Sequence, residues 1–198
     1  MYPKARLDAL TDGVFGVAMT LLALDIRLPA DFEPSGEPAL IAGLLALLPK
    51  FIPYVISFLV LGLRWLAGVQ VQFRSQTVSP VYVRWWLFYL FLITCVPFTT
   101  VVIGRFPHLA PAVWLYAGNT ALIAAVSSQM MRLLPEIELG PHVTALRVAF
   151  GTLLATSVIA IVISFFAPNV AIWALALNAL SPAQYHWMRG RKRYGSSH

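Results

Sequence analysis

Charge is scarce in this chain of 198 residues: Asp, Glu, Lys and Arg make up 11% of it, against 59% hydrophobic residues, and the mean hydropathy is +0.76. In soluble globular proteins the charged share is roughly 25%. Cysteine is scarcer still, because Cys95 is the only one, which excludes an intrachain disulfide and a metal site built from several cysteines. The composition therefore indicates a membrane protein.

Long uncharged runs occupy most of the chain. They predict an all-α polytopic membrane protein with six transmembrane helices in one domain, residues 1–198. A short outer helix is expected over residues 39–48, before the second span. The six expected spans cover residues 6–28, 51–73, 83–103, 110–131, 143–166 and 170–188.

The net charge of +6 is distributed unevenly along the chain. Lys and Arg gather at the two termini and in alternate connections, whereas the first outer connection holds Asp31, Glu33 and Glu37. This is the positive-inside pattern, and it predicts that both termini are cytoplasmic. The basic tail, residues 189–193, is interpreted as an orientation signal that contacts anionic lipid, so no nucleic-acid partner is expected.

The first span carries acidic residues into the membrane. Only the twelve uncharged residues 13–24 separate Asp12 from Asp25. At 1.5 Å per residue they cover about 18 Å of a hydrocarbon core about 30 Å thick. A charge at such depth costs roughly 2.5–3.5 kcal/mol on insertion scales and usually faces a partner, water or a pathway. This helix is therefore predicted to carry the function.

The start of this span, Arg6-Leu7-Asp8-Ala9-Leu10-Thr11-Asp12, resembles the R-x-x-x-F-S-D signature of the transmembrane protein 175 family of endosomal and lysosomal potassium channels and their bacterial relatives. Three departures occur: Leu10 replaces the usual Phe, Thr11 replaces Ser, and Gly68 stands where the family often has a His. The resemblance covers the first three spans and extends over residues 13–26, Ser57-Phe58, Trp65 and Pro97-Phe98-Thr99-Thr100.

The resemblance implies a subunit that assembles as a homotetramer around its first helix in the prokaryotic plasma (inner) membrane and passes potassium ions. It implies selection without the T-V-G-Y-G carbonyl filter, a segment that this sequence lacks. Apolar rings and a threonine ring take the place of that filter in the family. The family's hydrogen-bonded network around the pore helix maps onto Arg6, Thr11 and Asp12, with Trp65 as a candidate partner. Neither a cofactor nor an enzymatic activity is expected.

Helical periodicity places four candidate pore-lining residues on one stripe of the first span. At about 100° per residue, with Val17 at zero, Thr20 lies at roughly −60°, Leu21 at 40° and Leu24 at −20°, and Leu28 continues the stripe. Periodicity alone favours ordinary apolar packing, whereas the resemblance favours rings that oppose ion passage by dehydration. For Thr20, the alternative to a role in selectivity is a bond to its own helix carbonyl.

Several charged residues leave alternatives open. Asp12 lies at about −140° and is expected to face the subunit's own bundle. Arg64, in the second span, either pairs with Asp12 or Asp8 or extends to the cytoplasmic interface. Asp25 and Arg27 are interpreted as a solvated pair at the outer mouth.

Two other function classes remain in competition with a channel. A proton-coupled or other secondary transporter could use Asp12 and Arg6, although the sequence has neither repeat symmetry nor paired interrupted helices. A membrane enzyme would have only Asp8 and Asp12 as a carboxylate pair, without a His or Cys companion.

Overall fold

The computed structural model describes residues 1–70, 77–133, 141–167 and 170. This part of the chain is mostly helical, with two very short strands and connecting loops, which confirms the all-α prediction. Its elements are β1 (Tyr2–Pro3), α1 (Lys4–Leu22), the 3-10 turn η1 (Ala23–Asp25), α2 (Glu37–Leu45), α3 (Leu48–Gln70), β2 (Thr77–Val78), α4 (Pro80–Arg105), α5 (Ala110–Arg132) and α6 (Pro141–Ser164).

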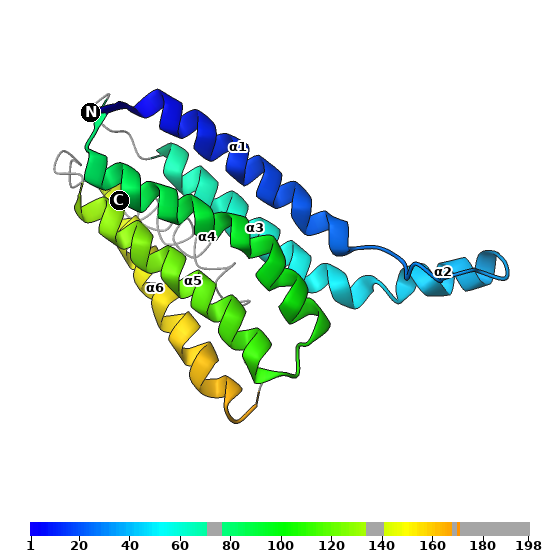
Figure 1. Ribbon diagram of the computed structural model, residues 1–198. Helices are drawn as coiled ribbons and strands as arrows, with labels where there is room; N and C mark the ends of the chain where they lie inside the picture. Colours follow the sequence, from blue (N-terminus) through cyan, green and yellow to red (C-terminus); the bar gives the residue numbers. More distant parts are fainter. Residues whose placement is uncertain (71–76, 134–140, 168–169, 171–198) are drawn as a thin grey trace, which may run out of the picture.

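The long helices form a bundle in which α4 packs against α1, α3 and α5, while α5 also packs against α6 (Figure 1). Helix α1 lies at one side of the bundle and contacts α3 and α4. The main core cluster unites four helices through Phe15 of α1, Leu61 of α3, Ile93 of α4 and Ile123 of α5, none of which is more than 1% exposed. The core therefore fixes which face of α1 is turned inward.

Five of the six expected spans correspond to α1, α3, α4, α5 and α6. Four of these helices are long and apolar enough to cross a membrane: Lys4–Asp25 with its 3-10 turn, Leu48–Leu66, Pro80–Arg105 and Ala110–Arg132. In α6 the apolar stretch is shorter, Phe150–Ser164. The sixth expected span, 170–188, lies almost entirely outside the described residues, as does the basic tail.

Local sequence explains where α4 begins and ends. The Ser79 hydroxyl accepts a hydrogen bond from the backbone N–H of Tyr82 at 3.2 Å, and Pro80 occupies the first turn, where its missing N–H costs nothing. The helix ends before Pro107, which disfavours helical geometry in the preceding residue. The observed helix is a few residues longer than the expected span 83–103 because the capping residues extend it beyond the apolar run.

Helix α1 ends earlier than predicted. The expected span reaches residue 28, but the α-helix stops at Leu22 and continues only as the 3-10 turn Ala23–Asp25. Asp25 forms an ion pair with Arg105 at the end of α4, and Pro29 disfavours helix at Leu28. The prediction that Leu28 continues the helical stripe is therefore wrong.

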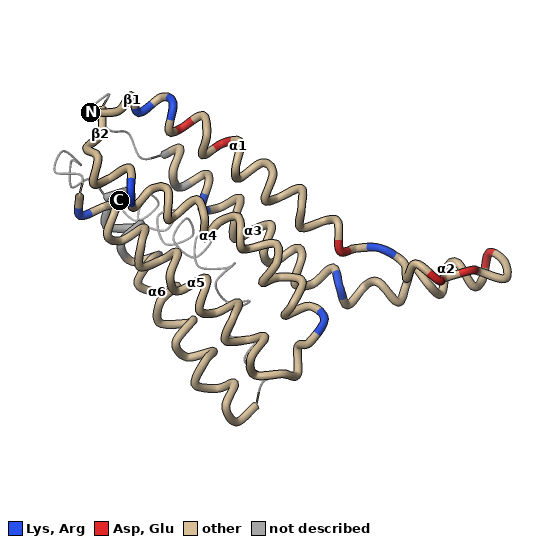
Figure 2. Tube along the Cα trace, in the orientation of Figure 1, with Lys and Arg blue, Asp and Glu red and all other residues tan. Residues whose placement is uncertain are grey.

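Between α1 and α3 the chain forms an arm that projects beyond the bundle and contains α2 (Figure 1). This is the short outer helix expected over residues 39–48. The ring of Phe32 packs directly over Gly43, where any Cβ would collide with it, so this contact requires glycine. Figure 2 shows acidic residues along the arm, whereas Lys and Arg lie at both ends of the bundle.

Candidate functional site

Helix α1 has one face in the core and one face without protein contact. Phe15, Ala18 and Leu22 are at most 2% exposed and pack into the bundle. The predicted stripe lies on the outward side, where Val17 is 57%, Leu21 43% and Leu24 67% exposed, and Thr20 is exposed as well. The four candidate pore residues thus share one outward face, and Leu24 extends it into the 3-10 turn.

The hydroxyl of Thr20 bonds to its own helix. Its Oγ1 donates to the carbonyl of Val17 at 2.8 Å, which is the alternative considered from the sequence. A hydroxyl that donates to the backbone still has oxygen lone pairs that can accept or coordinate. The back-bond therefore fixes the orientation of the oxygen without occupying its acceptor capacity.

The neighbouring residues Thr11 and Asp12 attach α1 to two different helices through indole N–H groups. Trp65 Nε1 of α3 donates to Asp12 Oδ1 at 2.8 Å, and Trp86 Nε1 of α4 donates to Thr11 Oγ1 at 2.9 Å. Thr11 Oγ1 in turn donates to the carbonyl of Leu7 at 2.8 Å. Asp12 is exposed, but its carboxylate has a hydrogen-bond partner within its own subunit.

Arg6 does not join Thr11 and Asp12. It is exposed, and no hydrogen bond or ion pair connects it to the described part of the chain. Six residues from Asp12, it lies on another side of the helix. Asp8 pairs with Lys4 one turn before it. Of the four residues assigned to the network, the structure thus brings Asp12 and Trp65 into direct contact and leaves Arg6 apart.

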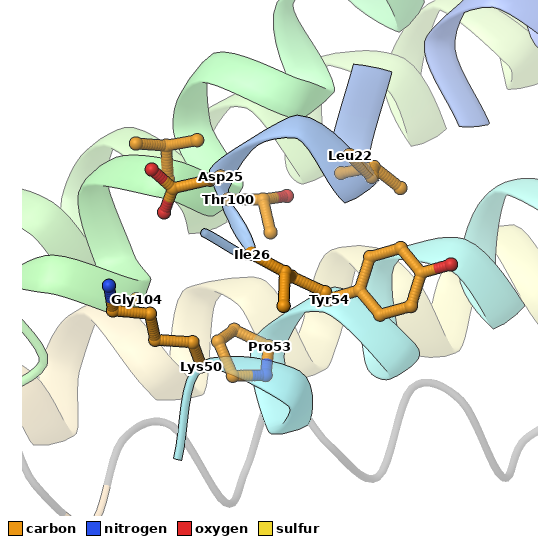
Figure 3. A pocket seen from close by; sticks show the side chains of 9 residues that line it. Leu22, Asp25, Ile26, Lys50, Pro53, Tyr54, Thr100 and Gly104 are labelled. Atoms are coloured by element: carbon orange, nitrogen blue, oxygen red, sulfur yellow. The ribbon is translucent and has the colours of Figure 1, made fainter. Parts of the chain in front are cut away.

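The outer end of α1 is held by the ion pair between Asp25 and Arg105, not by a pair between Asp25 and Arg27. The sequence-based interpretation of Asp25 and Arg27 as a pair is therefore wrong. A small pocket lies beside the ion pair, between the end of α1 and the neighbouring ends of α3 and α4 (Figure 3). Its lining includes Asp25, Lys50 and Thr100.

Arg64 is the most unusual charge in the bundle. All three guanidinium nitrogens are shielded from solvent, and none has a hydrogen-bond partner in the described structure. Neither Asp12 nor Asp8 pairs with it, because Asp12 accepts from Trp65 and Asp8 from Lys4. Extension to the interface is excluded by the burial of the guanidinium. Both alternatives drawn from the sequence are therefore wrong.

Sequence reasoning missed two further polar features. Trp86 is 7% exposed and bonds to Thr11. Its only sequence signal was a tryptophan close to the start of a span. The second feature is a buried group of hydroxyls on α3, α4 and α5, formed by Ser57, Thr100 and Tyr116, which helical periodicity cannot bring together across three helices.

Metal binding has no support within the described residues, because they contain no group of three or more His, Cys, Asp or Glu side chains that could hold an ion. The candidate site on α1 is therefore an apolar outward face that carries one hydroxyl, that of Thr20. Hydrogen bonds from Trp65 and Trp86 attach the helix to its neighbours.

Comparison with known proteins gives a consistent result. A potassium channel of Streptomyces collinus is 34% identical over 120 residues, which is 58% of this chain and 57% of that protein. A potassium channel of Chamaesiphon minutus is 30% identical over 130 residues, 64% of each chain. The matched region thus spans less than two thirds of the length of these relatives.

The fold is also found in a solved structure. The crystal structure of a lysosomal potassium-selective channel TMEM175 homolog from Chamaesiphon minutus matches with a TM-score of 0.68 and 22% identity, over 91% of this chain and 96% of that one. The family profile described as "Endosomal/lysosomal potassium channel TMEM175" matches residues 6–97, which contain the signature and the first three spans. These matches support the TMEM175 family: residues 6–97 are similar to its profile, and the fold is similar to that of the solved TMEM175 homolog.

Proposed function

We propose that this chain is the subunit of a potassium-permeable, leak-type cation channel whose pore is lined by α1 at the centre of a homotetramer. The observation that carries the proposal is the outward stripe of α1, formed by Val17, Thr20, Leu21 and Leu24, which has no protein cover within one subunit. One helix cannot enclose a pore, so several copies must bring this stripe to a common axis. The curated bacterial relatives, named as potassium channels, support the choice of ion.

The side chains around the stripe favour α1 over the other helices as the element that faces neighbouring copies. Along one flank of the stripe the exposed positions are small, at Ala9, Gly16 and Ala23, each seven residues apart. Small residues allow close approach of helix backbones in membranes. The outward face of α4 instead carries Phe88, Phe91 and Phe98, which are large apolar side chains suited to lipid.

An apolar constriction accounts for selection without carbonyl ligands. Four copies of Leu21 and Leu24 would surround the axis with aliphatic rings, where a passing ion must lose part of its hydration shell. The ring of Thr20 would add four oxygens whose donors are already engaged by the backbone. Oxygens of this kind can replace lost water more readily than aliphatic groups can.

A secondary transporter centred on Asp12 and Arg6 is less well supported. Such a carrier requires a binding or proton-transfer site where both groups act together. Here Asp12 accepts a hydrogen bond from Trp65, and Arg6 lies apart from it on the exposed surface. The relatives are channels, and the chain is not an enzyme. The charge pattern further supports an orientation with both termini in the cytoplasm, and the bacterial relatives support a location in the prokaryotic plasma membrane.

Reconstitution in liposomes tests the proposal. The purified protein should produce a passive conductance. In opposed potassium and sodium gradients its reversal potential should lie closer to the equilibrium potential of potassium than to that of sodium. A carrier would instead give a saturable flux that depends on a coupled gradient. Absence of any conductance from protein that elutes as a stable oligomer would contradict the channel.

A further inference from the structure

A line of hydroxyl groups runs through the interior of the subunit, away from the outward face of α1. Thr100 Oγ1 of α4 lies 2.8 Å from both Ser57 Oγ of α3 and the Val96 carbonyl, between which it shares its proton, and Ser57 Oγ shares a hydrogen bond with the Tyr116 hydroxyl of α5 at 3.1 Å. Ser57 is 1%, Thr100 5% and Tyr116 7% exposed. Each hydroxyl can both donate and accept, so the line is continuous across three helices.

One end of this line reaches the pocket at the outer end of the bundle. Thr100 lines that pocket together with Asp25 and Lys50, as Figure 3 shows. Both of these side chains are ionisable and lie near the outer end of the bundle. The hydroxyl line therefore begins at a place where protons and small cations are available.

The other end of the line meets Arg64. Ser57 and Arg64 are seven residues apart on α3, so they lie on the same face, about 10 Å apart along the axis. Both side chains are turned into the interior, since Ser57 is 1% exposed and the guanidinium nitrogens of Arg64 are shielded from solvent. Arg64 therefore extends the polar groups by about 10 Å from Ser57 toward the opposite end of α3. Arg64 is the charged member of this line.

The charge of Arg64 is not compensated by the described residues. Its guanidinium has no hydrogen-bond partner, and the carboxylates on the membrane-spanning helices are engaged elsewhere: Asp8 with Lys4, Asp12 with Trp65 and Asp25 with Arg105. An unpaired buried charge is costly and marks a functional position in a membrane helix. Its positive potential extends along the hydroxyl line because the surroundings are apolar.

We propose that Arg64 is an electrostatic plug, which keeps protons and small cations from crossing the interior of each subunit along the line Thr100–Ser57–Tyr116. A fixed positive charge placed in a narrow polar path repels cations while neutral molecules are unaffected. Permeation is thereby confined to the outward stripe of α1. This role is independent of whether the stripe conducts potassium.

Proton entry into liposomes that contain a pH-sensitive dye tests the plug. Potassium is kept equal on both sides with valinomycin, so that the axial path produces no voltage. Arg64→Gln should raise proton entry at least about tenfold. The reason is that a unit charge about 10 Å away, at an effective dielectric constant of about 20, changes the energy of a passing proton by more than the equivalent of one decade in rate. Arg64→Met is a second neutral variant, so the result does not depend on the folding of one protein.

Three controls separate a plug from a structural role. Arg64→Lys keeps the charge and should retain low proton entry, and the double variant Arg64→Gln with Ser57→Ala should return entry to the wild-type level because the hydroxyl line is interrupted. Leu122→Ala, on the exposed side of α5, should leave proton entry at the wild-type level. Thermal stability of Arg64→Gln should equal or exceed that of the wild type, since an unpaired buried charge has been removed.

Other results would overturn the proposal. Unchanged proton entry in folded Arg64→Gln and Arg64→Met would mean that the charge blocks nothing. An equal increase in Arg64→Lys would mean that the charge is not the cause. An increase that survives Ser57→Ala would mean that protons cross elsewhere.

Discussion

Thr11 and Asp12 show how two adjacent residues can attach one helix to two neighbours. Consecutive positions on a helix differ by about 100° in direction, so Thr11 faces Trp86 on α4 while Asp12 faces Trp65 on α3. Both tryptophans donate an indole N–H, a group with no acceptor capacity, and both acceptors lie on α1. The signature thus fixes the rotation of α1 about its own axis, and with it the direction of the stripe on the opposite side.

Asp12 should act on stability and assembly more than on ion preference. Asp12→Ala removes the acceptor of the Trp65 N–H and should lower the free energy of unfolding by about 1–2 kcal/mol. Asp12→Asn keeps a side-chain oxygen in the same place and should cost less. Asp8→Ala, which loses only a surface pair with Lys4, is the matched control. Thermal unfolding and oligomer yield in detergent measure the effect; equal stability of Asp12→Ala and Asp8→Ala would exclude the structural role.

Thr20 should contribute to selectivity through its oxygen. Thr20→Val keeps the shape of the side chain and removes the hydroxyl that bonds to Val17, whereas Thr20→Ser keeps the hydroxyl and removes a methyl group. We expect Thr20→Val to reduce discrimination between potassium and sodium severalfold and Thr20→Ser to retain most of it. Reversal potentials in mixed gradients measure both. Loss of discrimination in both variants to the same extent would assign the effect to packing.

At the scale of single helices, the sequence predicted where each helix lies in the chain better than where it ends or which side chains of other helices it contacts. Uncharged runs located α4 and α5 within a few residues, because a membrane span needs about 20 apolar residues. The helical wheel correctly grouped Val17, Thr20, Leu21 and Leu24 on one exposed side. It did not predict that α1 would end at Leu22, since that end depends on an ion pair with another helix.

The partners of polar side chains were the hardest to predict. A wheel gives the direction of a residue but not the identity of the helix it faces. For that reason the bond between Trp86 and Thr11 was missed, and Arg64 was assigned carboxylate partners that the bundle places elsewhere. Such contacts depend on how three helices rotate and shift relative to one another, which no periodicity within one helix specifies.

The stripe of α1 should control flux as a unit. Leu21→Ser and Leu24→Ala would make the proposed rings more polar or wider, lower the dehydration barrier, and raise flux about tenfold for each 1.4 kcal/mol removed. Discrimination between potassium and sodium should fall in parallel. Leu122→Ala is the matched control, because Leu122 is 49% exposed on α5, outside the contacts of α1. Equal fluxes in wild type, stripe variants and control, with folding intact, would mean that ions do not pass along α1.

At the scale of the whole molecule, the outward face of α1 differs in character from that of α4. The small residues beside the stripe contrast with the aromatic outward face of α4. The buried hydroxyls of α3, α4 and α5 and the shielded guanidinium of Arg64 are a separate feature of the subunit interior.

Assembly through the flank of α1 should be sensitive to the size of the residue at position 16. A Cβ on Gly16 meets nothing within 4 Å inside the subunit, so Gly16→Leu should leave the fold of the subunit intact. In a homotetramer centred on α1, the same leucine would stand between neighbouring helices and separate them. Gly151→Leu is the matched control, since Gly151 on α6 is also exposed with open space around its Cβ. Native mass measurement in detergent should give four subunits for the wild type and for Gly151→Leu, and smaller species for Gly16→Leu, with similar helix content in all three. A tetramer that persists in Gly16→Leu, or a wild-type protein that conducts as a monomer, would remove α1 from the centre of the assembly.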